Sequence, residues 1–156
     1  IDKSTKYGIE IQNKHILNKS LSAVINYAYT RAIVDEELRS DLCYVDNCKG
    51  NDVPGVSAHN VTFNLHYNHT KNSKFILMQK YRSETFALND WRNIFTQKQK
   101  AYYTTDIAYQ YRYKNIDFTA RVDNLFERSH GIWVSNNNIT PYNYTRNWTL
   151  GAKIAF

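Results

Sequence analysis

The stretch YTTDIAYQYRY, residues 103–113, decides the fold class of this chain. Successive side chains of a β-strand point to opposite faces, so odd and even positions can be read separately. The odd positions are mainly aromatic or aliphatic, and the even positions are mainly polar: Tyr103, Thr105, Ile107, Tyr109, Tyr111 and Tyr113 against Thr104, Asp106, Ala108, Gln110 and Arg112. The pattern predicts a β-strand with one apolar face and one polar face.

Six further segments show the same alternation, and no helical period competes with them. They cover residues 5–15, 21–34, 61–68, 74–88, 118–123 and 147–156. The sequence therefore predicts an all-β, antiparallel fold of about seven strands.

The predicted connections alternate in length. Short ones have the sequences ILNKS, HTKNS and YKNI, whereas long ones cover residues 35–58, 89–100 and 135–146. Short turns at one end and long loops at the other are typical of outer-membrane barrels, whereas a soluble meander has no reason for this asymmetry.

The composition fits a boundary between an apolar phase and water. The chain contains 13 Tyr, 7 Phe and 3 Trp, whose rings can be buried while a polar tip stays hydrated. No run of 18 apolar residues occurs, which excludes a membrane-spanning helix and leaves an alternating transmembrane β-barrel open. An aromatic-rich soluble β-protein, such as a β-sandwich binding module, is the alternative.

Seven strands cannot close a wide barrel, so we expect the sheet to continue in residues outside this chain. The chain begins IDKSTKYG, without a recognisable targeting signal, and we interpret it as a piece of a larger barrel. The predicted strands are long enough to cross an apolar band about 25 Å tall.

Other classes of function find little support in the sequence. The net charge is +6, but Lys and Arg are scattered singly, which argues against nucleic-acid binding. No G-x-S-x-G, H-E-x-x-H or phosphate-binding glycine loop occurs, so we expect neither an enzyme nor a cofactor.

Three stretches carry a resemblance to a known family: DVPGVSAHNVTFNLHY (52–67), YRYKNIDFTARVDNLFERSHG (111–131) and RNWTLGAKIAF (146–156). They resemble the C-terminal third of a TonB-dependent outer-membrane receptor. The most specific element is the triplet Asn124, Leu125 and Phe126, followed by the acidic Glu127.

The resemblance implies a 22-stranded barrel in the bacterial outer membrane, in contact with its lipid. Residues 1–156 would be the C-terminal segment of that barrel, with the N-terminal plug domain and the earlier strands absent. It also implies active import of a ferric siderophore, haem or another metal chelate, energised by the inner-membrane TonB complex. The rival interpretations are a passive porin and an outer-membrane barrel enzyme.

Two cysteines, Cys43 and Cys48, lie close together in the longest loop. A loop outside the cell is in an oxidising environment, so we expect a disulfide between them, worth about 2 kcal/mol by loop entropy. Two free thiols are the alternative, and no metal site is expected there.

Three histidines, His59, His66 and His69, cluster in the sequence AHNVTFNLHYNH. In a regular strand His66 and His69 point to opposite faces, so we expect structural polar residues and no metal site. The predicted lumen carries Lys80, Arg82, Glu84, Asp106, Gln110, Arg112, Arg121 and Asp123. We expect these side chains to pair with the plug domain more than with substrate.

The candidate substrate contacts are aromatic residues of the long loops: Trp91, Phe95, Trp133, Tyr142 and Tyr144. Their alternative role is in the outer aromatic girdle. The resemblance also implies that the final aromatic residue, Phe156, is read by the outer-membrane assembly machinery.

Overall fold

The computed structural model describes residues 3–36, 48–129, 132–135, 138–141 and 145–155. Seven antiparallel strands form one sheet in chain order, β1 (Ser4–Ile16), β2 (Leu21–Val34), β3 (His59–Thr70), β4 (Ser73–Arg82), β5 (Tyr102–Tyr113), β6 (Ile116–Asp123) and β9 (Asn147–Ile154). The predicted all-β class and seven-stranded sheet are confirmed. In the described part of the chain, β1 and β9 each have one neighbouring strand, so both edges are open as predicted.

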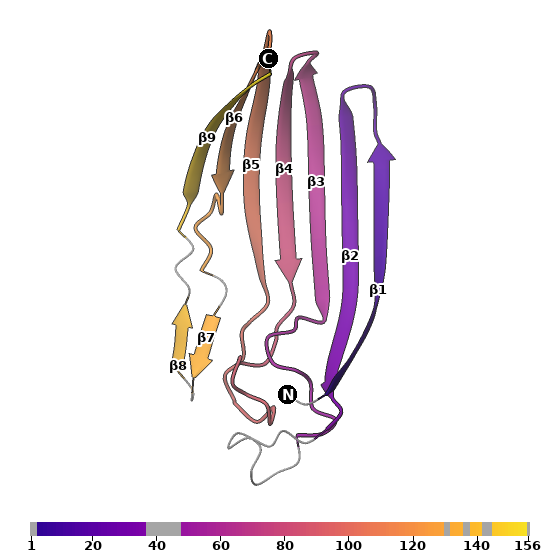
Figure 1. The fold of residues 1–156 in the computed structure, drawn as a ribbon, viewed down its shortest axis with the longest axis vertical. Helices are drawn as coiled ribbons and strands as arrows, with labels where there is room; N and C mark the ends of the chain where they lie inside the picture. Colours follow the sequence, from indigo (N-terminus) through magenta and orange to yellow (C-terminus); the bar gives the residue numbers. More distant parts are fainter. Residues whose placement is uncertain (1–2, 37–47, 130–131, 136–137, 142–144, 156) are drawn as a thin grey trace.

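The two ends of the sheet differ (Figure 1). Short turns at residues 17–20, 71–72 and 114–115 lie at the end where the C-terminus lies, and we call this the turn end. The long connections, which follow β2, β4 and β6, leave the sheet at the opposite, loop end. The short and the long connections therefore lie at opposite ends of the sheet, as predicted.

The strand register aligns the apolar positions into one continuous outer face. Leu65 lies beside Leu77, Leu77 beside Ile107, Ile107 beside Val122 and Val122 beside Trp148. Because side chains alternate with a period of two, one shared register places every odd position of β5 on this face. The apolar row thus crosses five strands without interruption.

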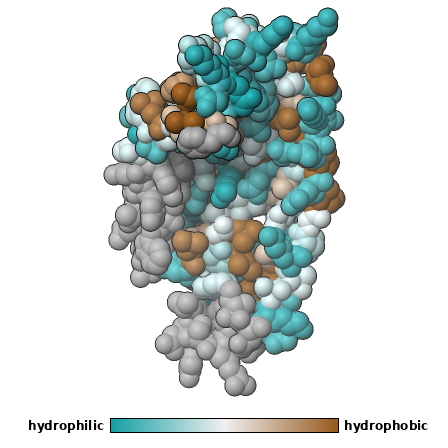
Figure 2. Space-filling model, turned by 45° about the horizontal axis from the view of Figure 1, so that its top comes forward, coloured by the Kyte–Doolittle hydropathy of each residue, from teal (hydrophilic) through white to brown (hydrophobic). Residues whose placement is uncertain are grey.

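Among the described residues, no second layer covers this outer face, and many of its large apolar side chains are exposed. They include Tyr7, Ile9, Ile11, Ile25, Tyr67, Phe75, Tyr81, Tyr103, Ile107, Tyr111, Tyr113, Phe118, Trp148, Leu150 and Ile154. Figure 2 shows hydrophobic residues gathered in patches along the flanks of the molecule. Such an exposed apolar face on a β-sheet is typical of the lipid-facing wall of a transmembrane β-barrel.

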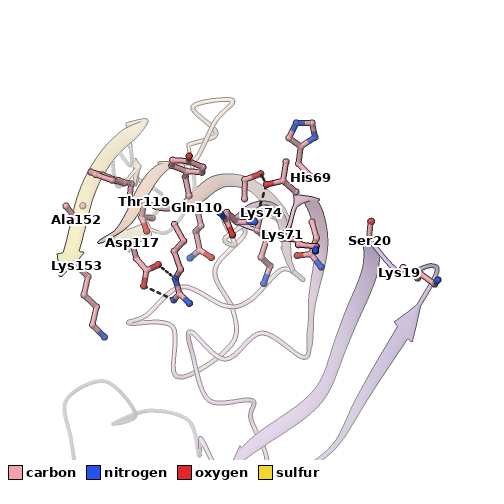
Figure 3. Close-up of a pocket in the computed structure, with 18 residues that line it drawn as sticks. Lys19, Ser20, His69, Lys71, Lys74, Gln110, Asp117, Thr119, Ala152 and Lys153 are labelled. Carbon is pink, nitrogen blue, oxygen red and sulfur yellow. Dashed lines mark hydrogen bonds and ion pairs between the residues drawn. The ribbon is translucent and has the colours of Figure 1, made fainter. Parts of the chain in front are cut away.

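The opposite, inner face is polar. Asp106 lies on it and hydrogen-bonds to Lys80 across the β4–β5 pair. Figure 3 views the turn end and shows Gln110, Asp117 and Lys153 on the concave side of the sheet. The face assignment predicted for β5 is confirmed.

Two parts of the loop end differ from the sequence prediction. Strand β4 ends at Arg82, although alternation was predicted to continue to residue 88, because Thr85 instead pairs with Gln99 within its own loop. The last connection is not strand-free: β7 (Ile132–Ser135) and β8 (Asn138–Pro141) form a separate antiparallel hairpin. Within the described residues, no helix is long and apolar enough to span a membrane.

Candidate functional site

The first two long loops pack against each other and form an ordered platform at the loop end, made of residues 48–58 and 83–101. Its centre is the carboxylate of Asp90, which is 1% exposed. The two oxygens accept hydrogen bonds from the backbone N–H groups of Ile94 (2.9 Å) and Phe95 (3.1 Å). A buried carboxylate with backbone donors fixes the turn that carries Phe95.

Asn93 joins the two halves of the platform. Its side-chain oxygen accepts the N–H of Asp52 (2.8 Å), and its side-chain nitrogen donates to the carbonyls of Asp52 and Asp90 (both 3.0 Å). Asn93 has a φ of 54°, a conformation that Asn tolerates better than most residues. Asp52 in turn pairs with Arg31 of β2 at 3.1 Å, which ties the platform to the barrel wall.

Cys48 and Trp91 form the small apolar centre of the platform. Cys48 is fully buried, and Trp91 packs against it. The Trp91 carbonyl accepts a hydrogen bond from the side chain of Asn51 at 3.0 Å. Cys43 lies outside the described residues, so the bridge to Cys48 stays a prediction.

A charged cluster lies on the inner face below the platform. Asp106 is 5% exposed and pairs with Lys80 (2.8 Å) and Arg121 (3.6 Å). Arg121 also pairs with Asp123 of the same strand. A buried carboxylate needs such partners, so Asp106 fixes the positions of two cations that line the lumen.

Asn124, the first residue of the N-L-F triplet, turns the chain out of β6. Its backbone N–H donates to Asp106 at 2.9 Å, and its φ is 51°. Its side chain accepts the N–H of Arg128 (2.9 Å) and donates to the Arg128 carbonyl (3.0 Å). The N–H of Leu125 donates to the carbonyl of Thr105 at 2.8 Å. The triplet therefore anchors the last long loop to β5.

A hollow of about 500 Å³ opens between the charged cluster and the loops. Its polar lining comes from β4, β5, β6, β9 and all three long connections: Ser57, Lys80, Arg82, Gln99, Tyr102, Thr104, Asp106, Asp123, Asn124, Thr145 and Asn147. Arg82 is exposed in this hollow, and no ion pair joins it to another described residue. Among the described residues that line the hollow, it is the cation without an ion-pair partner.

The predicted aromatic contacts divide into three groups. Trp91 and Phe95 lie half-buried in the platform. Trp133 lies on β7, and the structure describes only its backbone. Tyr142 and Tyr144 lie outside the described residues, as does Phe156. Of the predicted lumen residues, Glu84 lies beyond the end of β4 and pairs with Lys98 at 3.7 Å.

The three histidines do not converge. His59 meets the hydroxyl of Tyr27 at 2.9 Å on the outer face, near the loop end. His69 contacts Tyr67 and Phe75 at the turn end, and Figure 3 shows it pointing away from the concave side. Among the described residues, no three His, Cys, Asp or Glu side chains gather as metal ligands.

Sequence reasoning missed Asp90, Asn93 and the structural role of Asn124. The platform residues pair across 41 positions of the chain, as Asp52 and Asn93 do, and no local pattern encodes such a contact. Asn124 gave a usable signal, because Asn followed by a change from alternation to irregular sequence is typical of a left-handed turn residue.

A single sheet with a lipid-type outer face, a polar inner face and loops gathered at one end defines a segment of a transmembrane β-barrel. The sequence profile described as TonB dependent receptor-like, beta-barrel matches residues 1–125. This chain belongs to that family. No curated protein sequence matches the chain significantly.

Solved structures agree on the fold. The ferric yersiniabactin uptake receptor FyuA from Yersinia pestis has a TM-score of 0.71 and 20% identity, with 98% of this chain covered and 24% of that chain. The ferric citrate transporter FecA has a TM-score of 0.73 and 21% identity, with 96% and 24% covered. The copper transporter OprC has a TM-score of 0.70 and 16% identity, with 98% and 24% covered. This chain thus spans about a quarter of the length of these receptors and transporters.

Proposed function

We propose that this chain is the C-terminal part of a bacterial outer-membrane receptor that actively imports a metal chelate, such as a ferric siderophore or haem. Family membership supports the receptor class, and the neighbours named for ferric yersiniabactin, ferric citrate and copper support a metal-containing cargo. The proposed partners are the outer-membrane lipid, the protein's own plug domain and the TonB complex.

The observation that carries the proposal is the polar hollow on the inner face, directly below the ordered loops. A solute that enters from the loop end meets this hollow before the rest of the lumen. Arg82 offers an unpaired guanidinium there, which suits the carboxylate or catecholate oxygens of a chelate. Lys80 is held by Asp106 and adds positive potential at a fixed position.

The loop aromatics extend the proposed site. Trp91 and Phe95 are fixed by the platform, so they present rings without a large loss of side-chain entropy on binding. We propose that Trp133, Tyr142 and Tyr144 complete the contact surface from the last loop. Aromatic side chains suit the apolar backbone and rings of such chelates.

Uptake by the full-length receptor tests the proposal. Cells carrying it are given a panel of labelled ferric chelates, haem and copper chelates, with and without an intact TonB complex. We expect accumulation of one chelate that disappears without TonB. Equal uptake in both strains would identify a passive pore and overturn the proposal.

Substitution of Arg82 tests the site. Arg82→Glu is expected to weaken binding of an anionic chelate at least tenfold, because it replaces attraction by repulsion in a partly enclosed site. The matched control is Lys100→Glu, which makes the same charge change at an exposed position outside the lining of the hollow. Equal loss in both variants would show a general charge effect and remove Arg82 from the site.

A further inference from the structure

A groove opens on the outer face of the sheet, across β5, β6 and β9. Ala120 of β6 lies between Tyr109 of β5 and Leu150 of β9 in the strand register, so a methyl group stands between two much larger side chains. The groove has a volume of about 370 Å³ and an almost entirely apolar lining. Toward the loop end it continues between Ile107, Val122 and Trp148.

The two walls of the groove differ in how they are packed. On the β5 side, the ring of Tyr109 lies against the ring of Phe75, with 4.6 Å between the ring centroids. On the β9 side, Trp148 and Leu150 are the most open part, and Leu150 is 83% exposed. A flexible apolar chain can therefore enter from the outside and pack against a wall that is already ordered, which limits the entropy lost on binding.

Arg128 lies at the loop end of this groove. Tyr103 is on the same face as Ile107, four residues away, or about 13 Å along β5. A terminal nitrogen of Arg128 donates to the Tyr103 hydroxyl at 2.6 Å, and the guanidinium lies 4.9 Å from the ring centroid. Arg128 is exposed, and no carboxylate of the described residues forms an ion pair with it. Its charge is fixed in position and not neutralised.

A second arginine, Arg146, lies on the same face just before β9. Its neighbours in the chain, Thr145 and Asn147, both line the inner hollow, so alternation places Arg146 on the outer side. Its Nε donates to the carbonyl of Leu125 at 3.0 Å, and a terminal nitrogen lies 3.7 Å from Glu127, beyond the range of a strong charged hydrogen bond. The loop ends of β6 and β9 are adjacent (Figure 1), so the two arginines belong to one end of the groove.

We propose that the groove and these two arginines bind a phosphate-bearing lipid of the outer leaflet. The headgroup phosphate lies at Arg128 and Arg146, whose planar guanidinium groups match phosphate oxygens, and an acyl chain lies in the groove beside Ala120. The loop end faces outward in the proposed orientation, and aromatic and basic side chains are typical at the level of lipid headgroups. The inference rests on the outer-membrane placement proposed above and not on the import of a metal chelate.

Arg31 shows that a basic residue on the outer face does not by itself form such a site. It lies on β2 near the same end of the sheet, but Asp52 pairs with it at 3.1 Å and supplies its counter-charge from within the chain. Arg128 has no such partner among the described residues and stands above an apolar groove. Charge and groove together distinguish one bound lipid from the general lipid contact of a barrel wall.

Native mass spectrometry of the full-length receptor in detergent tests the proposal, because it counts the lipids that stay bound. The receptor is mixed with lipid A, with dephosphorylated lipid A, or with lipid A and an excess of inorganic phosphate. We expect lipid A to be retained about tenfold more than its dephosphorylated form, since the phosphate supplies the charged contacts. Inorganic phosphate should displace little lipid A, because the free ion has no acyl chain.

The headgroup contact is tested by Arg128→Gln, which removes the charge and leaves the backbone bonds of this residue to Asn124 in place. Retention of lipid A should fall about tenfold. Lys114→Gln is the matched control, because the Lys114 ammonium also lies over a tyrosine ring, that of Tyr113, but at the turn end. This control should retain lipid A as the wild type does.

The acyl-chain contact is tested by Ala120→Phe, which fills the groove with an apolar ring that a lipid-facing wall accepts. Retention of lipid A should again fall about tenfold, because the chain loses its apolar contact area. Ile25→Phe is the matched control, since it adds a ring at an exposed apolar position of β2 outside the groove. Its retention of lipid A should equal that of the wild type.

Three outcomes would overturn the proposal: equal retention of the two lipid forms, unchanged retention in Arg128→Gln or Ala120→Phe, or displacement of lipid A by inorganic phosphate, which would identify a free-anion site. Only folded, heat-modifiable receptor is scored, and the wild-type comparison of the two lipid forms decides alone if a variant does not assemble. Chelate uptake is measured separately. Loss of lipid preference with uptake intact would refute the lipid site alone, and lipid retention without uptake would refute the import function alone.

Discussion

At the scale of single residues, the polar groups most important for the structure are those that need side-chain hydrogen-bond or ion-pair partners in addition to the backbone. Asp106 illustrates this, because it is nearly buried and accepts bonds from Lys80 and from the backbone of Asn124. One side chain thereby links the lumen charges to the base of the last loop. Asn124 then uses both atoms of its own amide on Arg128.

Asn124→Ala should destabilise the folded receptor by about 3 kcal/mol. It removes two side-chain hydrogen bonds, worth roughly 1 kcal/mol each, and leaves a non-glycine residue with a left-handed φ. The measurement is urea unfolding of the full-length receptor in lipid bilayers. Asn124→Gly, which removes the bonds but accepts the φ, should cost less than Asn124→Ala. An equal loss of unfolding free energy in the two variants would mean that the left-handed backbone conformation of Asn124 does not affect stability.

At the scale of the element, the side-chain pattern of each strand in this sheet reflects the environments of its two faces. The period-two pattern predicted both faces of β5 correctly, because alternation depends on local backbone geometry alone. The same pattern failed at the end of β4. Residues 83–88 still alternate, but Thr85 pairs with Gln99 in the loop platform, a contact that depends on two distant segments meeting.

Ile107→Arg should cost about 2 to 4 kcal/mol of unfolding free energy, because it places a charge on the lipid face near the middle of β5. Gln12→Arg, on the inner face of β1, is the matched control and should cost little. The comparison uses folding titrations in lipid vesicles. A negligible cost for Ile107→Arg would show that the two faces are assigned the wrong way round.

The loop platform carries a second prediction, that Cys43 and Cys48 are joined by a disulfide. A thiol reagent that cannot cross the membrane should leave both residues unlabelled in intact cells and label them after reduction. Because Cys48 is buried, the same reaction is also run in denaturant without reductant. Labelling of both cysteines in that denatured, unreduced sample would show that they are free thiols and that the predicted disulfide is wrong.

At the scale of the whole molecule, the sequence predicted the class of fold and the ends of the sheet but not the site. The number of strands, the lengths of the turns and the apolar face follow from short-range patterns. The platform, the charged cluster and the hollow depend on contacts such as Asn51 with Trp91 and Asp52 with Asn93, which come from different loops. Such contacts depend on the sheet, which brings segments distant in the sequence together at its loop end.

Phe156 belongs to the whole molecule, because its predicted role is in barrel assembly. Deleting it from the full-length receptor should reduce the amount of folded, heat-modifiable barrel in the outer membrane. Affinity per assembled receptor should not change, because β9 runs from the loop end to the turn end and ends at the opposite end of the sheet from the long loops. Normal assembly with weakened binding would contradict both the role of Phe156 and the orientation of β9.

The direction of the two edge strands has an arithmetical consequence. β1 and β9 both run from the loop end to the turn end, because five strands lie between them and neighbouring strands run in opposite directions. Two strands that run the same way cannot be joined antiparallel to each other. Any closed antiparallel barrel that contains this sheet must therefore add an odd number of strands. The strand that pairs with β9 must begin at the turn end, whatever the total circumference of the barrel.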